Sequence, residues 1–125
     1  MKVFMSSVLN KKQHNVNVRM SYTATQIIAS LAQLEGWKLS GDGTDLAIEK
    51  TYAFANYLET MGFVNAVAFM AERQDHHPEM LVTYNRCTLR WNTHDVGGIS
   101  VTDFECAAAA DALVADPNHA TGKAA

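Results

Sequence analysis

Three of the five histidines lie in two short segments that also carry acidic residues. His76 and His77 directly precede Pro78, and His94 lies further along the chain. Carboxylates flank both segments, at Glu72, Asp75, Glu79 and Asp95. An imidazole can give and take a proton near neutral pH, and a neighbouring carboxylate can fix its tautomer and raise its basicity. The pattern therefore predicts proton-transfer chemistry on a bound small molecule, or a metal site.

Metal-dependent and nucleophilic catalysis fit the sequence less well. Three histidines could supply the ligands of an open catalytic zinc, but the helical H-x-x-x-H spacing is absent. The two cysteines, Cys87 and Cys106, both fall within apolar patterns, and the sequence contains neither a G-x-S-x-G motif nor a glycine-rich phosphate loop. Metal-free acid–base catalysis is therefore the leading interpretation, with no metal and no cofactor expected.

The elements on either side of the histidines must position them. Apolar residues recur at helical spacing over residues 54–74. A helix there must end before Pro78, because the residue before a proline avoids the helical region. His76 and His77 therefore fall on a connection, where both side chains can converge on one pocket.

His94 follows a segment that alternates between apolar and polar residues. Cys87, Leu89 and Trp91 fall on one face of residues 86–92, whereas the other face is polar. The polar face carries Arg86, Thr88, Arg90 and Asn92. This alternation predicts an antiparallel strand with one buried face.

The remaining elements complete an α+β order. A capping box at Thr23 and Gln26 begins a helix over residues 23–35, and Ser100 with Asp103 resembles a cap for a helix over 101–115. Further strands are predicted over residues 37–39, 46–52 and 80–85. The order helix, two strands, helix, two strands, helix indicates an antiparallel sheet with helices packed on one face.

Length and charge limit the classes of protein. The 125 residues, 48% of them hydrophobic, predict one globular domain over residues 21–116, with an N-terminal arm over 1–20 and a flexible tail over 117–125. A net charge of −3, with no basic block longer than Lys11-Lys12, argues against nucleic acid as a partner.

The expected location is the cytoplasm. No apolar run approaches the roughly 20 residues that span a bilayer, so no membrane association is expected. The N-terminus lacks the apolar core of a signal peptide. Two distant cysteines outside any C-x-x-C motif are typical of buried thiols in a reducing compartment.

Taken together, these segments resemble a known family. The resemblance rests on Glu72-x-x-Asp75-His76-His77-Pro78-Glu79, Tyr84-Asn85, Thr93-His94-Asp95-x-Gly97-Gly98-Ile99 and Asp103, with Gly36-Trp37 and Tyr52-x-Phe54 upstream. In these motifs the chain resembles the pterin-4a-carbinolamine dehydratases over roughly residues 21–115. The combination of H-H-P with a downstream T-H-[DE]-x-x-G is more specific than either part alone.

The resemblance implies a fold, an assembly and a reaction. The fold is a four-stranded antiparallel sheet carrying three helices on one face, and the assembly is a homodimer or homotetramer. The substrate is a pterin: water is lost from 4a-hydroxytetrahydrobiopterin to give quinonoid dihydropterin. This reaction regenerates the cofactor of aromatic amino acid hydroxylases such as phenylalanine hydroxylase, so enzymes of that pathway are candidate partners.

The resemblance also suggests roles for the individual residues. His76 and His94 would form the acid–base pair, and His77 would chiefly bind the pterin. The acidic candidates would orient the imidazoles or bind the amino group of the pterin: Glu72, Asp75 and Asp95. The other substrate-binding candidates are Pro78, Thr93, Trp37 and Asp103.

The alternative to an enzyme is a protein-binding module. Members of the family that the chain resembles also serve as dimerisation cofactors of a transcription regulator, and degenerate relatives act as assembly factors. An exposed sheet edge at Met80–Asn85 would favour such a role, since an open edge can pair with another strand. The intact histidine set favours retained catalysis.

Overall fold

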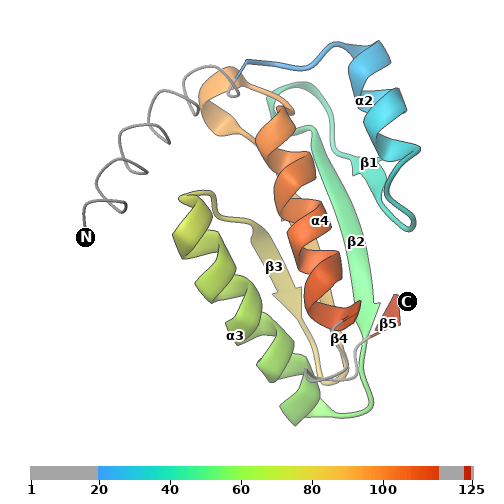
Figure 1. Cartoon of the computed structure of the whole chain (residues 1–125), viewed down its shortest axis with the longest axis vertical. Helices are drawn as coiled ribbons and strands as arrows, with labels where there is room; N and C mark the ends of the chain where they lie inside the picture. Colours follow the sequence, from blue (N-terminus) through green and yellow to red (C-terminus); the bar gives the residue numbers. More distant parts are fainter. Residues whose placement is uncertain (1–19, 116–122, 125) are drawn as a thin grey trace.

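The computed structural model describes residues 20–115 and 123–124, and its strands form one antiparallel sheet (Figure 1). The strand order is β1-β2-β4-β3. The strands are β1 (Lys38–Ser40), β2 (Ala47–Ala53), β3 (Glu79–Val82) and β4 (Arg86–Trp91). The predicted antiparallel sheet is therefore confirmed, with β1 paired to β2 and β3 paired to β4.

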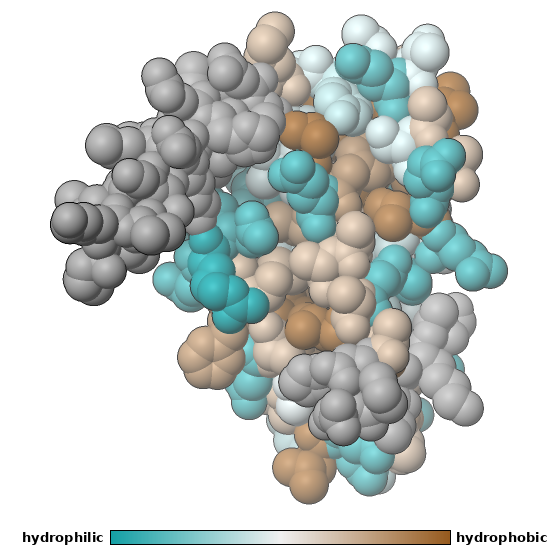
Figure 2. Space-filling view, viewed as in Figure 1, coloured by the Kyte–Doolittle hydropathy of each residue, from teal (hydrophilic) through white to brown (hydrophobic). Residues whose placement is uncertain are grey.

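Three α-helices within the described residues accompany this sheet, which confirms the predicted α+β class. They are α2 (Ala24–Leu31), α3 (Tyr57–Gln74) and α4 (Val101–Ala115). In Figure 1, α3 and α4 run side by side across one face of the sheet. Figure 2, from the same side, shows light-brown surface down the middle of this face, where α4 carries its run of alanines.

The ends of three elements differ from the sequence-based expectation by more than one residue. The helix α2 stops at Leu31, four residues short, and turns lead from there to Gly36, which adopts a left-handed conformation with φ of 87°. The helix α3 starts at Tyr57 instead of residue 54, because the side chain of Asn56 caps it by accepting from the Glu59 amide at 2.9 Å. The strand β3 ends at Val82 because residues 83–86 form the turn into β4.

The two ends of the chain are only partly described. The predicted N-terminal arm, except for residue 20, lies outside the described residues. Most of the predicted tail does too, but Lys123–Ala124 form a short strand, β5, that pairs with Tyr52 and Ala53 of β2. None of the helices in the described ranges combines the length and the apolar sequence that crossing a bilayer requires.

The core lies between the sheet and the helices. The alternation predicted for residues 86–92 is confirmed, because Cys87, Leu89 and Trp91 of β4 are fully buried. Neighbouring β2 contributes Ile48 and Tyr52, both also fully buried. On the opposite face of the sheet, which the described helices leave uncovered, the polar residues of both strands are partly exposed.

Candidate functional site

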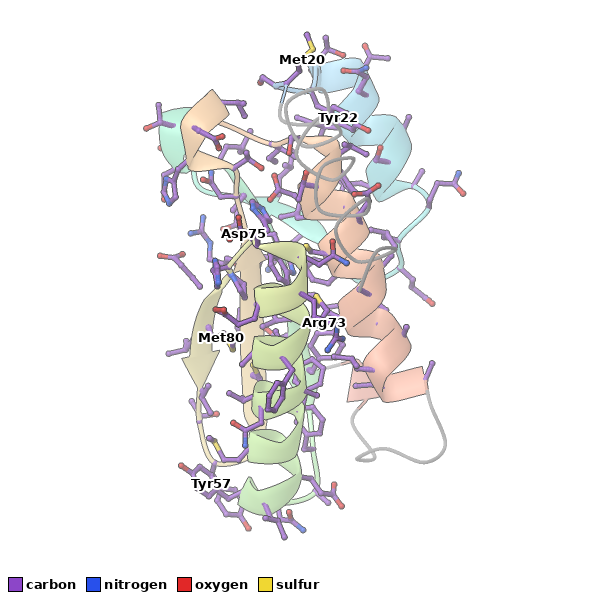
Figure 3. All side chains as sticks on the ribbon, turned by 60° about the vertical axis from the view of Figure 1, so that its left-hand side comes forward. Met20, Tyr22, Tyr57, Arg73, Asp75 and Met80 are labelled. Carbon is purple, nitrogen blue, oxygen red and sulfur yellow. The ribbon has the colours of Figure 1, made fainter. Side chains whose placement is uncertain are left out.

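The chain turns at the end of α3 so that two adjacent histidines, His76 and His77, point in opposite directions. Asp75 caps this helix in a left-handed conformation, with φ of 51° and ψ of 43°, and the amide of His76 then donates to the carbonyl of Ala71 at 3.1 Å. Figure 3 shows Asp75 at this end of α3, where the chain leaves the helix for β3. As a result, His76 turns inward and is 6% exposed, whereas the side chain of His77 is 57% exposed.

The buried histidine is held by a carboxylate and an aromatic ring. His76 Nε2 lies 2.6 Å from Asp103 Oδ1. Its ring stacks on the indole of Trp91, with centroids 5.7 Å apart and planes inclined by 12°. These two contacts fix both the position and the orientation of the imidazole.

Asp103 is itself fully buried and joins both histidine segments. Its Oδ2 accepts from the hydroxyl of Thr93 at 2.7 Å and from the amide of Ser100 at 3.0 Å. Thr93 directly precedes His94, so one carboxylate holds His76 on one side and the start of the His94 turn on the other. Its place in the first turn of α4 also favours a negative charge, since the N-terminal end of a helix is the positive end of its dipole.

The hydrogen bonds around Asp103 favour one tautomer of His76. A carboxylate oxygen only accepts, so the proton of the 2.6 Å contact belongs on His76 Nε2. The neutral imidazole then presents Nδ1 as its acceptor nitrogen. This is the arrangement in which a carboxylate prepares a histidine to take a proton.

The other two histidines meet at a small hollow on the surface. His77 and His94 line it together, and its volume is about 40 Å³. The other lining residues are Asp45, Glu79, Arg90 and Asn92. Outside the hollow, His77 Nε2 lies 3.0 Å from Glu72 Oε1, an exposed pair that contributes little to stability but orients the ring.

Arg90 is the fixed centre of this hollow. Its Nη1 donates to Glu79 Oε1 at 2.5 Å and its Nε donates to the hydroxyl of Ser40 at 2.9 Å. Its Nη2 donates to the carbonyl of Asp45 at 3.0 Å. The hydrogen bond to Glu79 is the main cause that raises the pKa of Arg90, so the guanidinium stays charged.

Arg90, Asn92 and Asp45 were not among the predicted site residues. The alternation over 86–92 had placed Arg90 and Asn92 on the polar face of their strand, which is the signal that could have found them. The amide of Asn92 donates to the carbonyl of Leu46 at 2.5 Å, so it ties β4 to the segment before β2. Asp45 belongs to a turn between β1 and β2 that carried no sequence signal for a site.

Trp37 occupies a different part of the molecule from the histidines. It is buried in the core, and its indole Nε1 donates to Asp111 Oδ2 at 3.1 Å. The hollow at His77 and His94 does not include it. Among the other predicted residues, Pro78 is half-buried beside His77 and Asp95 is exposed beside His94.

Metal ligands do not gather in the part of the chain that the structure describes. Within these residues, no three histidine, cysteine or acidic side chains are arranged to hold a metal ion. Cys87 and Cys106 are both buried and are not joined by a disulfide, in line with the predicted buried thiols. Burial raises the pKa of the Cys87 thiol to about 11 and so disfavours its thiolate form.

Comparison with known proteins identifies relatives that share this chain over most of its length. The family described as pterin 4 alpha carbinolamine dehydratase matches residues 20–113. A provisionally named pterin-4-alpha-carbinolamine dehydratase of Paracidovorax citrulli is 60% identical over 110 residues, which cover 88% of this chain and 95% of that protein. A protein of Bdellovibrio bacteriovorus with the same provisional name is 46% identical over 112 residues, covering 86% of this chain and 88% of that protein.

Two solved structures are similar to the fold. A transcriptional coactivator/pterin dehydratase from Brucella melitensis has a TM-score of 0.69 and 29% identity, covering 74% of this chain and 96% of its own. A pterin dehydratase-like protein described as a RuBisCO assembly factor in the alpha-carboxysome has a TM-score of 0.53 and covers 62% of this chain and 88% of its own. Its identity of 23% extends the likeness to the fold alone.

Proposed function

Because the chain belongs to the pterin 4 alpha carbinolamine dehydratase family, we propose that it removes water from 4a-hydroxytetrahydrobiopterin to give quinonoid dihydropterin. The observation that carries this proposal is the buried carboxylate of Asp103, which bonds His76 and also Thr93, the residue before His94. One side chain therefore fixes the imidazole of His76 and anchors the start of the turn that carries His94. After a two-electron reduction to the tetrahydropterin by a separate enzyme, the product would again serve aromatic amino acid hydroxylases as their cofactor, and the reaction would take place in the cytoplasm.

The reaction needs two proton transfers and no change of oxidation state. The bond between C4a and the hydroxyl oxygen breaks, and its electron pair leaves with the oxygen, which takes up a proton to become water. A ring nitrogen loses its proton, and the electrons of that N–H bond form the new C=N bond. A positioned acid and a positioned base are each worth about 10²–10⁴-fold in rate.

The three histidines divide these tasks. We assign proton transfer to His76 and His94, in line with the family resemblance, and binding of the pterin to His77. His76 is buried and does not line the hollow at His77 and His94. With the proton on its Nε2 directed to Asp103, Nδ1 would be the nitrogen that exchanges protons. His94 lies in an exposed turn at the hollow, where water and substrate have access to it. Glu72 holds His77 in its orientation.

The proposal is tested by following the dehydration of synthetic 4a-hydroxytetrahydropterin by absorbance. Wild type, His76→Ala and His94→Ala are compared, each with and without a chelator. We expect the wild-type rate to survive chelation and each variant to lose about 10²–10⁴-fold. A folded wild-type protein without any rate above background would refute the dehydratase, and a rate lost on chelation alone would point to a metal.

A second candidate function is strand pairing at the edge of the sheet. The strand β3 pairs with β4 alone among the described strands, and Leu81 in it is 66% exposed. Tyr84 in the turn that follows is 64% exposed. Unpaired backbone groups beside apolar side chains invite a further strand, so we propose that this edge forms protein contacts. The expected homodimer or homotetramer is the simplest such contact.

Analytical ultracentrifugation of wild type and Leu81→Lys tests this second role. A charge on an edge strand opposes pairing, so we expect wild type to sediment as an oligomer and the variant to dissociate. Ile28→Lys, at an isoleucine that is 67% exposed, is the matched control, since it lies on α2 and not on the edge strand. If both variants keep the wild-type sedimentation coefficient, the edge does not hold the assembly together.

A further inference from the structure

The hollow at His77 and His94 is too small for a whole pterin. At about 40 Å³ it has room for about three water molecules. A second hollow of about 380 Å³ adjoins it, and this size falls in the range of roughly 300–1,000 Å³ that small-molecule sites occupy. The two hollows share Glu79 and Arg90. A ligand whose reacting edge reaches the histidines must therefore extend elsewhere, and the larger hollow is next to it.

The sheet explains why the two hollows are continuous. Along the polar face of β4, alternate residues are about 6.6–6.8 Å apart. Asn92, just past the strand, lines the small hollow, Arg90 lines both, and Thr88 lines the large one. The register places Glu49 of β2 and Glu79 of β3 on either side of Arg90. The result is a groove that runs from His77 and His94 along β4, on the face that the described helices leave uncovered.

The walls of the larger hollow carry more negative than positive charge. Glu49 and Glu79 supply two carboxylates, against the single guanidinium of Arg90. All three guanidinium nitrogens already have partners, in Glu79, Ser40 and Asp45. An incoming anion would find no guanidinium nitrogen without a partner and two like charges nearby.

The same walls suit hydroxyl groups on a short carbon chain. Carboxylate oxygens have several acceptor positions, so Glu49 and Glu79 can accept from hydroxyls even while they contact Arg90. Met80 and Leu81 add an apolar wall for the carbon atoms. Thr88 shares its hydroxyl with Thr51, 2.7 Å away on β2, so its position is fixed.

Building on the proposed function, we propose that this larger hollow is the subsite for the C6 side chain of the pterin. It selects neutral, hydroxylated side chains over anionic ones such as phosphate esters. Glu49 is the specificity-determining residue, because it lines the larger hollow but not the hollow at the histidines.

Equilibrium binding tests the subsite independently of turnover. Three oxidised, fluorescent pterins are titrated, with a methyl, a dihydroxypropyl or a phosphate-bearing group at C6. For wild type at low salt, we expect the phosphate-bearing pterin to bind about fivefold to tenfold more weakly than the dihydroxypropyl pterin. Glu49→Lys should abolish or reverse this ratio, and high salt should reduce it in wild type.

Glu105→Lys is the matched control, because it makes the same charge change at an exposed site on α4. Equal Kd values for the three pterins in wild type, or equal effects of the two glutamate variants, would overturn the subsite. The proposed dehydratase would stand in either case if the 4a-hydroxytetrahydropterin with a methyl group at C6 is dehydrated. Conversely, a charge-selective Kd without turnover would support the subsite and refute the dehydratase.

Discussion

Asp103 and Asp111 lie on the same helix, and each holds a polar cluster against the sheet. Asp103 accepts from His76, Thr93 and Ser100. Asp111, two turns further along α4, accepts from Lys50 Nζ at 2.8 Å, from the indole of Trp37 and from the hydroxyl of Tyr52. Both clusters join segments distant in sequence, and both therefore stabilise the fold.

The two clusters differ in the chemistry of their partners. The ammonium of Lys50 is also bonded to the carbonyl of Glu35 at 3.0 Å and lies 5.0 Å from the ring centre of Tyr52, so its charge is fully compensated where it is. The partner of Asp103 is instead an imidazole, a group that can change its charge near neutral pH. The next residue along the chain, His77, lines an open hollow. On the proposed function, Asp103 therefore serves both the site and the fold, whereas Asp111 serves the fold.

The largest expected effect is the loss of activity in Asp103→Asn. The amide can donate to His76 as well as accept from it, so the tautomer with the proton on Nε2 loses its preference. We expect kcat to fall about 10²–10⁴-fold. Asp111→Asn, at the other end of the same helix, is the control and should keep kcat within a few-fold. Equal loss of kcat in the two folded variants would erase the distinction between the clusters.

The second effect concerns stability and should appear in the other cluster. Lys50→Met leaves the carboxylate of Asp111 without its cation. Removing one partner of a buried ion pair costs roughly 3–5 kcal/mol, and we expect about 2–3 kcal/mol here because Asp111 is 28% exposed. Urea unfolding measures this, with exposed Lys38→Met as the matched control. An unchanged free energy of unfolding would mean that the pair contributes no net stability.

The third effect is a loss of stability at alkaline pH. Burial, followed by the hydrogen bond to Asp111, raises the pKa of Tyr52 well above its ordinary range, and burial raises the pKa of Cys87, its partner across the strands, to about 11. Both groups stay protonated in the folded state while the unfolded chain loses their protons, above pH about 8.5 for the thiol and about 10 for the phenol. The contribution of these two groups to the free energy of unfolding is therefore fully present below these pH values and is lost as pH rises above them.

Each group contributes a slope of at most about 1.4 kcal/mol per pH unit. Urea unfolding of wild type, Tyr52→Phe and Cys87→Ala over this alkaline range measures the slopes, each variant being compared with its own value at neutral pH. We expect both substitutions to flatten the decline. A wild-type decline that neither substitution flattens would place the alkaline sensitivity in another part of the molecule.

The smallest effect tests the left-handed conformation of Asp75, which directs the following residue, His76, toward Asp103. Because Asp75 adopts a left-handed conformation, Asp75→Gly should change the free energy of unfolding by less than about 1 kcal/mol. Asp75→Val should cost about 1–2 kcal/mol, since a β-branched residue is strained there. Chemical denaturation measures both, and equal stability of the two variants would show that this conformation is not maintained in solution.

The elements that carry the candidate site could largely be predicted from local sequence. Pro78 limits α3 and forces the two histidines onto a connection, because proline restricts the residue before it. The alternation over 86–92 identifies the buried face of β4, since successive side chains on a strand point to opposite faces. These rules act over a few residues, and the element order and the histidine set followed from them.

Tertiary structure decided which distant residues meet. Trp37 was predicted at the pterin site, but the structure places it against Asp111. No pattern in the sequence had indicated that Asp111 would bond to core residues. Asp103 was one of several candidates until the fold brought its carboxylate to 2.6 Å from His76, and Arg90 became the centre of the hollow only through strand register. A sequence pattern reveals which face of an element is buried, but the partner on that face depends on how the helices and strands pack together in three dimensions.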